Sequence, residues 1–158
     1  MHICLALFYI CFVATPECSS LPTNKDMIRN TVNDIIHTAK TTLAHIKRLT
    51  TLLQMPPLIN DTIDPIEGLT TIIHELGCLD NELQTDFTEH FTQIQVDVSS
   101  LEGRVRSLAS TIGCTSPARP VRGHTTDRFQ DSYLYLTLSK VQRYLENLIR
   151  NSSKLEVC

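Results

Sequence analysis

The sequence predicts an all-α protein, a four-helix bundle of the up-up-down-down type with two long crossover connections. Four stretches carry apolar residues at alternating spacings of three and four, the period of an amphipathic α-helix. The connections between these stretches are long, short and long, and long connections let consecutive helices run parallel. We expect the helices at about residues 25–48, 65–84, 89–112 and 132–151.

The first helix is expected to start near Thr23 and Asp26, whose spacing of three is a helix-start signature. No glycine or proline interrupts it, and its apolar face consists of Ile28, Val32, Ile35, Ile36, Ala39, Leu43 and Ile46. The pattern weakens over residues 47–53, and Pro56 and Pro57 should end any helix. The sequence therefore predicts one long amphipathic helix.

The second helix has a start signal at Asp64, which can cap it, with Pro65 at the first helical position and Glu67 completing a capping box. Its apolar face consists of Ile66, Leu69, Ile72, Ile73, Leu76, Leu79 and Leu83. Gly77 costs helix stability, which predicts a bend or a close contact there. Cys78 lies nearly opposite the apolar face, so we expect it to be exposed.

The third and fourth helices repeat the same spacing. The apolar face of the third consists of Phe91, Ile94, Val98, Leu101, Val105, Leu108 and Ile112. Gly113 is placed to cap its end. The apolar face of the fourth consists of Leu134, Leu138, Val141, Leu145 and Leu148.

The first twenty residues read as a secretory signal peptide. An apolar run from Ile3 to Val13 is too short to span a bilayer, and small residues up to Ser20 supply a cleavage site. Cleavage would start the mature chain at Leu21, and residues 21–158 would form a single domain. We therefore expect a secreted, extracellular protein that folds in an oxidising compartment.

Three cysteines remain after this cleavage, so at most one internal disulfide can form. Cys114 ends the third helix and Cys158 follows the fourth. In the crossover topology these two ends meet at one pole of the bundle, which predicts a Cys114–Cys158 bond. Cys78, in the middle of a helix, is left as a free thiol.

Composition and motifs exclude several classes of function. The net charge of −3 does not suggest binding to nucleic acid or to an anionic membrane, which call for a concentrated basic patch, and no second apolar segment is long enough to anchor the chain in a membrane. His74, Glu75 and Cys78 resemble a broken HExxH zinc motif without its second histidine, so an exposed polar face explains them better. No catalytic set can be assembled. We expect no enzyme activity, no cofactor and no metal.

At this point the chain resembles the leptin family. The third helix carries HFTQIQVDVSSLEGRVRSLASTIGC, with a Gln-Ile pair, an aspartate four residues beyond the Gln and a closing cysteine. The fourth carries TLSKVQRYLENLIRNSSKLEVC, an L-S-basic-aliphatic-Q pattern at the same distance from a final cysteine. Leu21-Pro22 and Asp64-Pro65-Ile66 are similar too. The chain departs from the family in lacking tryptophan, in a shorter connection before the fourth helix and in Cys78.

This resemblance implies a hormone of the long-chain class I helical cytokine type, monomeric before it binds a leptin-receptor-like ectodomain, that drives JAK–STAT signalling and regulates energy balance. It places the main receptor-binding face on the first and third helices, at Thr31, Asp34, His37, Thr38, Gln93, Asp97, Ser100 and Arg104. These positions are also on the solvent side by periodicity. The alternatives are another class I helical cytokine or a secreted lipid-binding helical bundle.

The resemblance also implies a second contact, which would recruit another receptor copy. Its residues would be Leu58, Ile59, Asn60, Ser132 and Tyr133. Asn60 and Asn151 each begin an Asn-x-Ser/Thr sequon, the acceptor for N-glycosylation in a secreted protein. A glycan on Asn60 would argue against the second contact.

Overall fold

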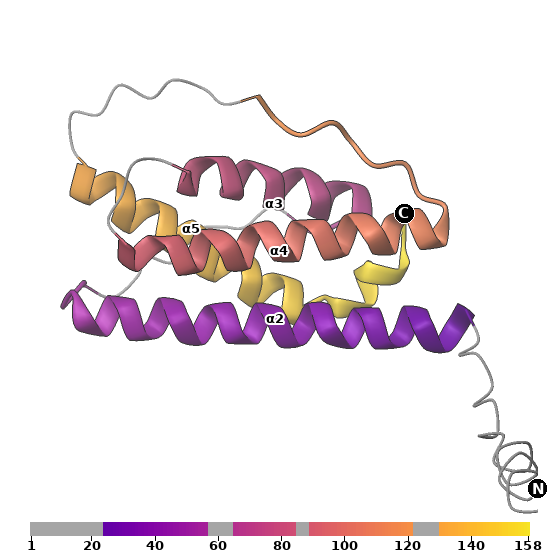
Figure 1. The fold of residues 1–158 in the computed structure, drawn as a ribbon, viewed down its shortest axis with the longest axis horizontal. Helices are drawn as coiled ribbons and strands as arrows, with labels where there is room; N and C mark the ends of the chain where they lie inside the picture. Colours follow the sequence, from indigo (N-terminus) through magenta and orange to yellow (C-terminus); the bar gives the residue numbers. More distant parts are fainter. Residues whose placement is uncertain (1–23, 57–64, 85–88, 122–129) are drawn as a thin grey trace, which may run out of the picture.

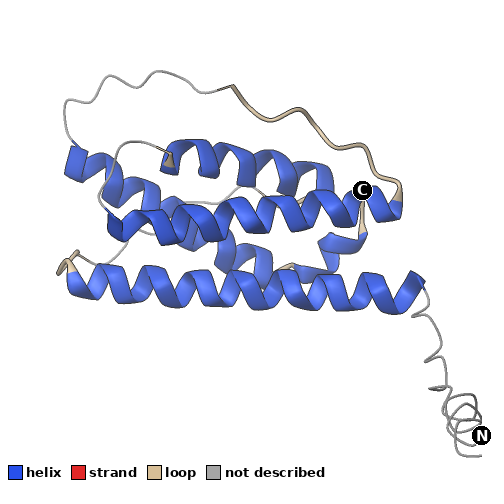
Figure 2. Ribbon diagram, in the orientation of Figure 1, coloured by secondary structure: helices blue, strands red, loops and turns tan. Residues whose placement is uncertain are grey.

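The computed structural model describes residues 24–56, 65–84, 89–121 and 130–158. All regular structure within them is helical (Figure 2). The elements are α2 (Asn24–Leu52), α3 (Leu69–Leu83), α4 (Glu89–Ile112), α5 (Gln130–Arg150) and a short 3₁₀-helix η1 (Ser152–Glu156). The predicted signal peptide lies outside these residues.

The four long helices form an up-up-down-down bundle, as predicted. In Figure 1, α2 and α3 run from right to left, and α4 and α5 run from left to right. α4 packs against both α2 and α3, and α5 packs against α2 and, to a smaller extent, α3. The two long connections thus return the chain to the opposite end of the bundle each time.

The core consists of the apolar stripes that the spacing predicts. Its largest fully buried side chains are Ile35, Ile46, Leu69, Ile72, Ile73, Leu76, Ile94, Leu101, Leu108, Leu138, Leu145 and Leu148. Each such side chain contributes about 1.5–3 kcal/mol relative to an exposed position. In α2 the predicted stripe is wider than the buried one, because Ile28, Val32, Ile36 and Leu43 are only partly buried at its edges.

α2 is longer than expected, because a tertiary contact and a specific end motif override the weak pattern. Leu49 is only 6% exposed and joins the core, which holds an additional turn. The helix then ends in a Schellman motif, in which Met55 N–H donates to Thr50 O at 3.0 Å and Gln54 N–H to Thr51 O at 3.3 Å. Gln54 has φ +51, so the left-handed residue of this motif, rather than proline, stops the helix.

Replacing Gln54 with glycine should raise the free energy of unfolding by about 1 kcal/mol, because glycine adopts positive φ without the steric cost that an L side chain bears. Urea denaturation of the two proteins measures this difference. Gln84, at the end of α3 with φ −78, is the contrasting position, and Gln84→Gly should destabilise the protein because it removes the hydrogen bond to Asp80 and gains nothing from a positive φ. A loss of stability in Gln54→Gly would contradict the assigned helix end.

α3 begins at Leu69 rather than at Pro65, so the predicted capping box does not start this helix. Gly68, at the N-cap position, is in extended conformation and has no side chain that could cap the helix; instead Leu69 N–H donates to the carbonyl of Val157 at 2.8 Å. The Thr70 hydroxyl donates to Cys158 O at 3.2 Å. A Cβ on Gly68 would lie 2.8 Å from Val157 O and Cys158 C. The helix starts where this distant segment satisfies its first donors.

The predicted disulfide is present and ties that segment in place. Cys114 and Cys158 are bonded, with their Cα atoms 5.4 Å apart, and Cys78 is free. Gly113, with φ +87, ends α4 and turns the chain toward the bond, as its position predicts. Cys114 N–H donates to Ala109 O at 2.8 Å in the same motif.

An ion cluster around the buried Glu102, which was not predicted from the sequence, holds the start of the second crossover against the bundle. Glu102 on α4 is fully buried and accepts hydrogen bonds from Arg119 and, at 2.6 Å, from Arg106. Arg106 also donates to Pro117 O at 2.7 Å, and Asn81 to Pro120 O at 2.6 Å. Residues 113–121 therefore run along α3 and α4 (Figure 1). Only the Glu-x-x-x-Arg spacing hinted at this cluster.

Gly77 leaves room on α3 for the segment of residues 113–121. A Cβ at Gly77 would be 3.0 Å from the Pro120 ring. The close contact predicted at this glycine is therefore present, and the crossover segment makes it. Asp80, one turn farther along α3, is 2% exposed and accepts from Gln95 and Gln84, each at 3.0 Å. Burial raises the pKa of its carboxyl in spite of these hydrogen bonds.

Candidate functional site

The residues predicted for the main binding face lie on α2 and α4, which pack side by side and antiparallel (Figure 1). Thr31, Asp34, His37 and Thr38 are on α2, and Gln93, Asp97, Ser100 and Arg104 are on α4. Thr31, Thr38 and Asp97 are partly buried and the other five are exposed. We call these eight residues together the α2–α4 face.

Asp97 is the best-anchored member of the α2–α4 face. Its two carboxylate oxygens are engaged separately, one by Gln93 Nε2 at 2.7 Å and the other by His45 Nδ1 at 2.6 Å. With its proton on Nδ1, His45 donates to the carboxylate across the helix pair. The Asp97 side chain is 13% exposed. This arrangement holds Asp97 and Gln93 in fixed positions while Gln93 still faces solvent.

His45 was not among the predicted residues. It lies eleven residues, or about three turns, beyond Asp34, which places it on the same stripe of α2. That spacing was the signal available in the sequence. Its pairing with Asp97 depends on how α2 and α4 are aligned, which only the packed bundle reveals.

A second link across the face joins Asp34 and Arg104. The Arg104 guanidinium lies 3.9 Å from the Asp34 carboxylate, and both side chains are largely exposed, at 47% and 67%. Exposed pairs of this kind add little to stability. Both charged groups therefore remain free to exchange this contact for one with a partner.

The threonines of the face direct their hydroxyls into their own helix. Thr31 donates to Met27 O at 2.9 Å and Thr38 to Asp34 O at 2.8 Å. Their hydroxyl protons are thus already used, and their methyl groups remain for contact. Polar recognition on α2 is left to Asp34 and the exposed His37.

The second predicted contact is only partly described. Ser132 is exposed and Tyr133 partly buried in the first turn of α5. Leu58, Ile59 and the sequon at Asn60 lie outside the described residues. The other sequon asparagine, Asn151, is partly buried. Its Nδ2, the atom that would carry a glycan, donates to the carbonyl oxygen of Asn147 at 3.0 Å and to its side-chain Oδ1 at 2.7 Å.

Cys78 is a free, partly buried cysteine whose surroundings disfavour its ionised form. His74 Nδ1 is 4.0 Å from the Cys78 sulfur and 3.3 Å from a Glu75 oxygen. Burial, together with the carboxylates of Glu75 and Glu82, raises the pKa of the Cys78 thiol, which disfavours the reactive thiolate. Over the described ranges, no three His, Cys, Asp or Glu side chains are grouped to hold a metal ion.

No helix within the described part of the chain has the length and hydropathy to cross a membrane. Comparison with known proteins gives one informative result. The chain is 42% identical to Leptin-B of Oryzias latipes, an alignment that covers all 158 residues and the full length of both proteins. No protein-family model and no solved structure matches the chain.

Proposed function

Since the chain belongs to the leptin family, we propose that it is a secreted protein that binds the ectodomain of a leptin-receptor-like class I cytokine receptor and triggers JAK–STAT signalling. As a leptin-like hormone it is not an enzyme, and receptor binding with a role in energy balance follows from the family. The observation that carries this proposal is the 42% identity to Leptin-B over the full length of both proteins.

The α2–α4 face supports the proposal because five of its eight residues are exposed and its charged groups make contacts across the helix pair. The hydrogen bonds to Asp97 keep the side chain of Gln93 in place, which reduces the conformational entropy lost on binding. Asp34 and Arg104 contribute exposed charges of opposite sign, a pattern that favours a specific partner over a nonspecific one. We place the main receptor contact here.

Replacing Gln93 and Asp97 together with alanine is expected to weaken binding to the receptor ectodomain about 100-fold, as for the loss of a central polar anchor. Surface plasmon resonance with the chain from Leu21 to Cys158 measures this. The matched control is Gln142→Ala/Glu146→Ala on α5, since Gln142 Nε2 donates to Glu146 at 2.9 Å with the same i,i+4 spacing.

The control should bind like wild type. Equal affinity of the two double variants would remove the α2–α4 face from the proposal, and no binding by the folded wild type would refute the receptor assignment itself. Thermal melting monitored by circular dichroism checks that each variant is folded.

The second contact and the secretion of the chain are further parts of the proposal. Ser132 and Tyr133 would meet another receptor copy together with Leu58, Ile59 and Asn60, and so bring two receptors together for signalling. Residues 1–20 would be removed during secretion. Amino-terminal sequencing of the secreted protein should then begin at Leu21, and a start at Met1 would contradict the assigned signal peptide.

A further inference from the structure

The second half of α2 presents a cationic face to solvent. Between Lys40 and Leu52 the helix contains no acidic residue. Lys40, Ala44, Lys47 and Thr51 follow one another at spacings of four, three and four, so they form one outward stripe. All of them are exposed. The charge of this stripe is opposite in sign to that of the whole chain, which is −3.

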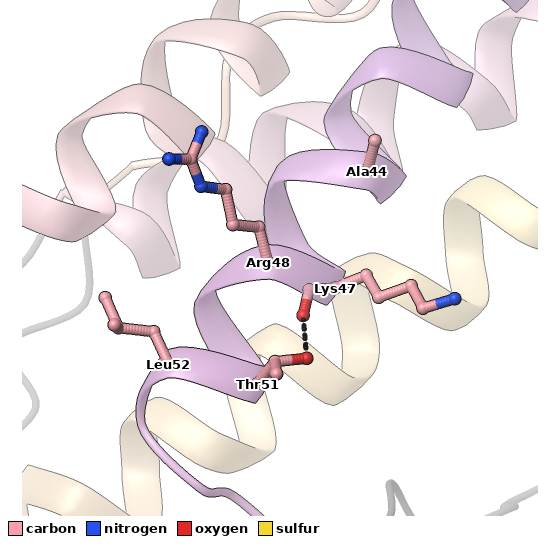
Figure 3. A pocket seen from close by; sticks show the side chains of 5 residues that line it. All are labelled: Ala44, Lys47, Arg48, Thr51 and Leu52. Carbon is pink, nitrogen blue, oxygen red and sulfur yellow. Dashed lines mark hydrogen bonds between the residues drawn. The ribbon is translucent and has the colours of Figure 1, made fainter.

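A shallow hollow lies on this face, lined by Ala44, Lys47, Arg48, Thr51 and Leu52 (Figure 3). Arg48 and Leu52 extend to one side of the helix and Lys47 to the other. Leu52 is 64% exposed, an unusual position for a leucine in a helix whose other leucines, Leu43 and Leu49, pack toward the core. The hollow thus combines an apolar surface with a cationic rim.

The cations of this rim have no acidic partner in the part of the chain that the structure describes. The helix dipole stabilises positive charges in the last turn of a helix, where α2 has no basic residue. It accounts for neither Lys40, three turns from the end of the helix, nor the exposed side chain of Leu52. The cations of this rim, beside an exposed leucine, form a surface that a partner segment with acidic and aliphatic side chains would complement.

The hollow is continuous with the α2–α4 face. α2 and α4 are antiparallel, with Asp34 opposite Arg104 and His45 opposite Asp97. Arg48 lies one turn beyond His45, and Gln93 lies one turn before Asp97, so this register brings Arg48 level with Gln93. A partner that covers Gln93 would therefore reach the hollow.

We propose that this hollow extends the receptor-binding surface and takes a segment of the receptor ectodomain in which an aliphatic side chain is flanked by acidic residues. The inference rests on the proposed function and adds to it the chemistry of the receptor segment. Because the chain as a whole is acidic, this local positive field would orient an acidic partner toward the end of α2.

The test is the double variant Lys47→Glu/Arg48→Glu, with binding to the immobilised leptin receptor ectodomain measured at low and at physiological ionic strength. We expect the affinity to fall about tenfold, mostly through slower association. The association rate of this variant should also depend less on salt concentration than that of wild type. Leu52→Ser should instead speed dissociation, by about fivefold, since it removes the apolar contact. Lys47→Gln/Arg48→Gln should give an intermediate loss of affinity.

The matched control is Lys25→Glu/Arg150→Glu, which changes the net charge equally at exposed positions outside the hollow. This control should bind within about twofold of wild type. If the Gln93/Asp97 variant loses affinity while Lys47→Glu/Arg48→Glu behaves like the control, the inference is wrong and the main face stands. If wild type does not bind at all, the proposed function fails instead.

Binding to phosphatidylserine-containing vesicles separates a membrane contact from a receptor contact. Wild type should show no more binding to these vesicles than Lys47→Glu/Arg48→Glu. Vesicle binding that this variant abolishes, with receptor binding unchanged, would overturn the assignment of the hollow to a receptor segment.

Discussion

Replacing Cys158 with serine is expected to lower the free energy of unfolding by about 4 kcal/mol, the largest effect of any single substitution considered for this protein. The bond joins residues 44 apart in sequence, and opening it restores that loop's freedom to the unfolded chain. Since domains of this size are stable by about 5–15 kcal/mol, the variant should unfold at markedly lower urea concentration.

Two controls make this measurement specific. Cys78→Ser removes a free thiol and should change stability by less than about 1 kcal/mol. Cys114→Ser/Cys158→Ser should be no less stable than Cys158→Ser alone, because both lose the same cross-link. A double variant that loses clearly more would show that the two cysteines act separately.

The loss of the bond should also reach α3. Val157 and Cys158 supply acceptors to Leu69 N–H and the Thr70 hydroxyl, and the disulfide holds them at that helix start. Hydrogen exchange in Cys158→Ser should therefore accelerate at the Leu69 amide more than in the middle of α4. Uniform acceleration over both helices would mean that the bond acts only through global stability.

Replacing Glu102 with glutamine is expected to lower the free energy of unfolding by about 3 kcal/mol. Glu102 is fully buried and neutralises Arg106 and Arg119. This loss of stability is at the low end of the range for breaking a buried ion pair, because both arginine side chains keep some access to solvent. Glu146→Gln, an exposed residue of α5, should cost less than about 0.5 kcal/mol. Equal losses would contradict the structural role of the cluster.

The effect of Glu102→Gln should depend on pH. Burial by itself would raise the pKa of Glu102, but the hydrogen bonds from Arg119 and Arg106 outweigh it and hold the pKa below its usual value of 4.5. A carboxyl whose pKa is depressed by folding contributes stability above its unfolded pKa and loses it as the pH falls through the folded pKa. The gap between wild type and Glu102→Gln should therefore be widest near neutral pH and narrow below pH 4.5.

Local periodicity predicted most of the bundle. The stripe from Leu134 to Leu148 is buried as expected, because an apolar residue every three or four positions leaves a helix only one face to pack. Connection length then indicated the helix directions, and the directions indicated the Cys114–Cys158 pair. Each of these steps depends on spacing along the chain, which a single sequence displays.

Positions that depend on a distant backbone could not be predicted in the same way. The pattern at Asp64 and Pro65 was a good local start for α3, yet the helix begins at Leu69, where Val157 accepts its hydrogen bond. Glu102 reads as one more polar residue of an amphipathic helix until the crossover places Arg119 beside it. A local signal for a helix cap or for exposure is overridden when a residue distant in sequence supplies a better hydrogen-bond or ion-pair partner for the same backbone or side-chain group.

The residues of the α2–α4 face show the same difference between what local spacing predicts and what packing decides. The sequence by itself determined that Gln93, Asp34 and Arg104 face outward, since the helical period alone assigns a side to each, and all three are exposed. It assigned the same side to Asp97, which the contact with α2 leaves only 13% exposed. Only the tertiary structure decided that Asp97 meets His45 and Asp34 meets Arg104, because antiparallel packing sets the alignment of α2 on α4. Spacing within a helix is set by its own hydrogen bonds, whereas the alignment of two helices is set by how their side chains interlock.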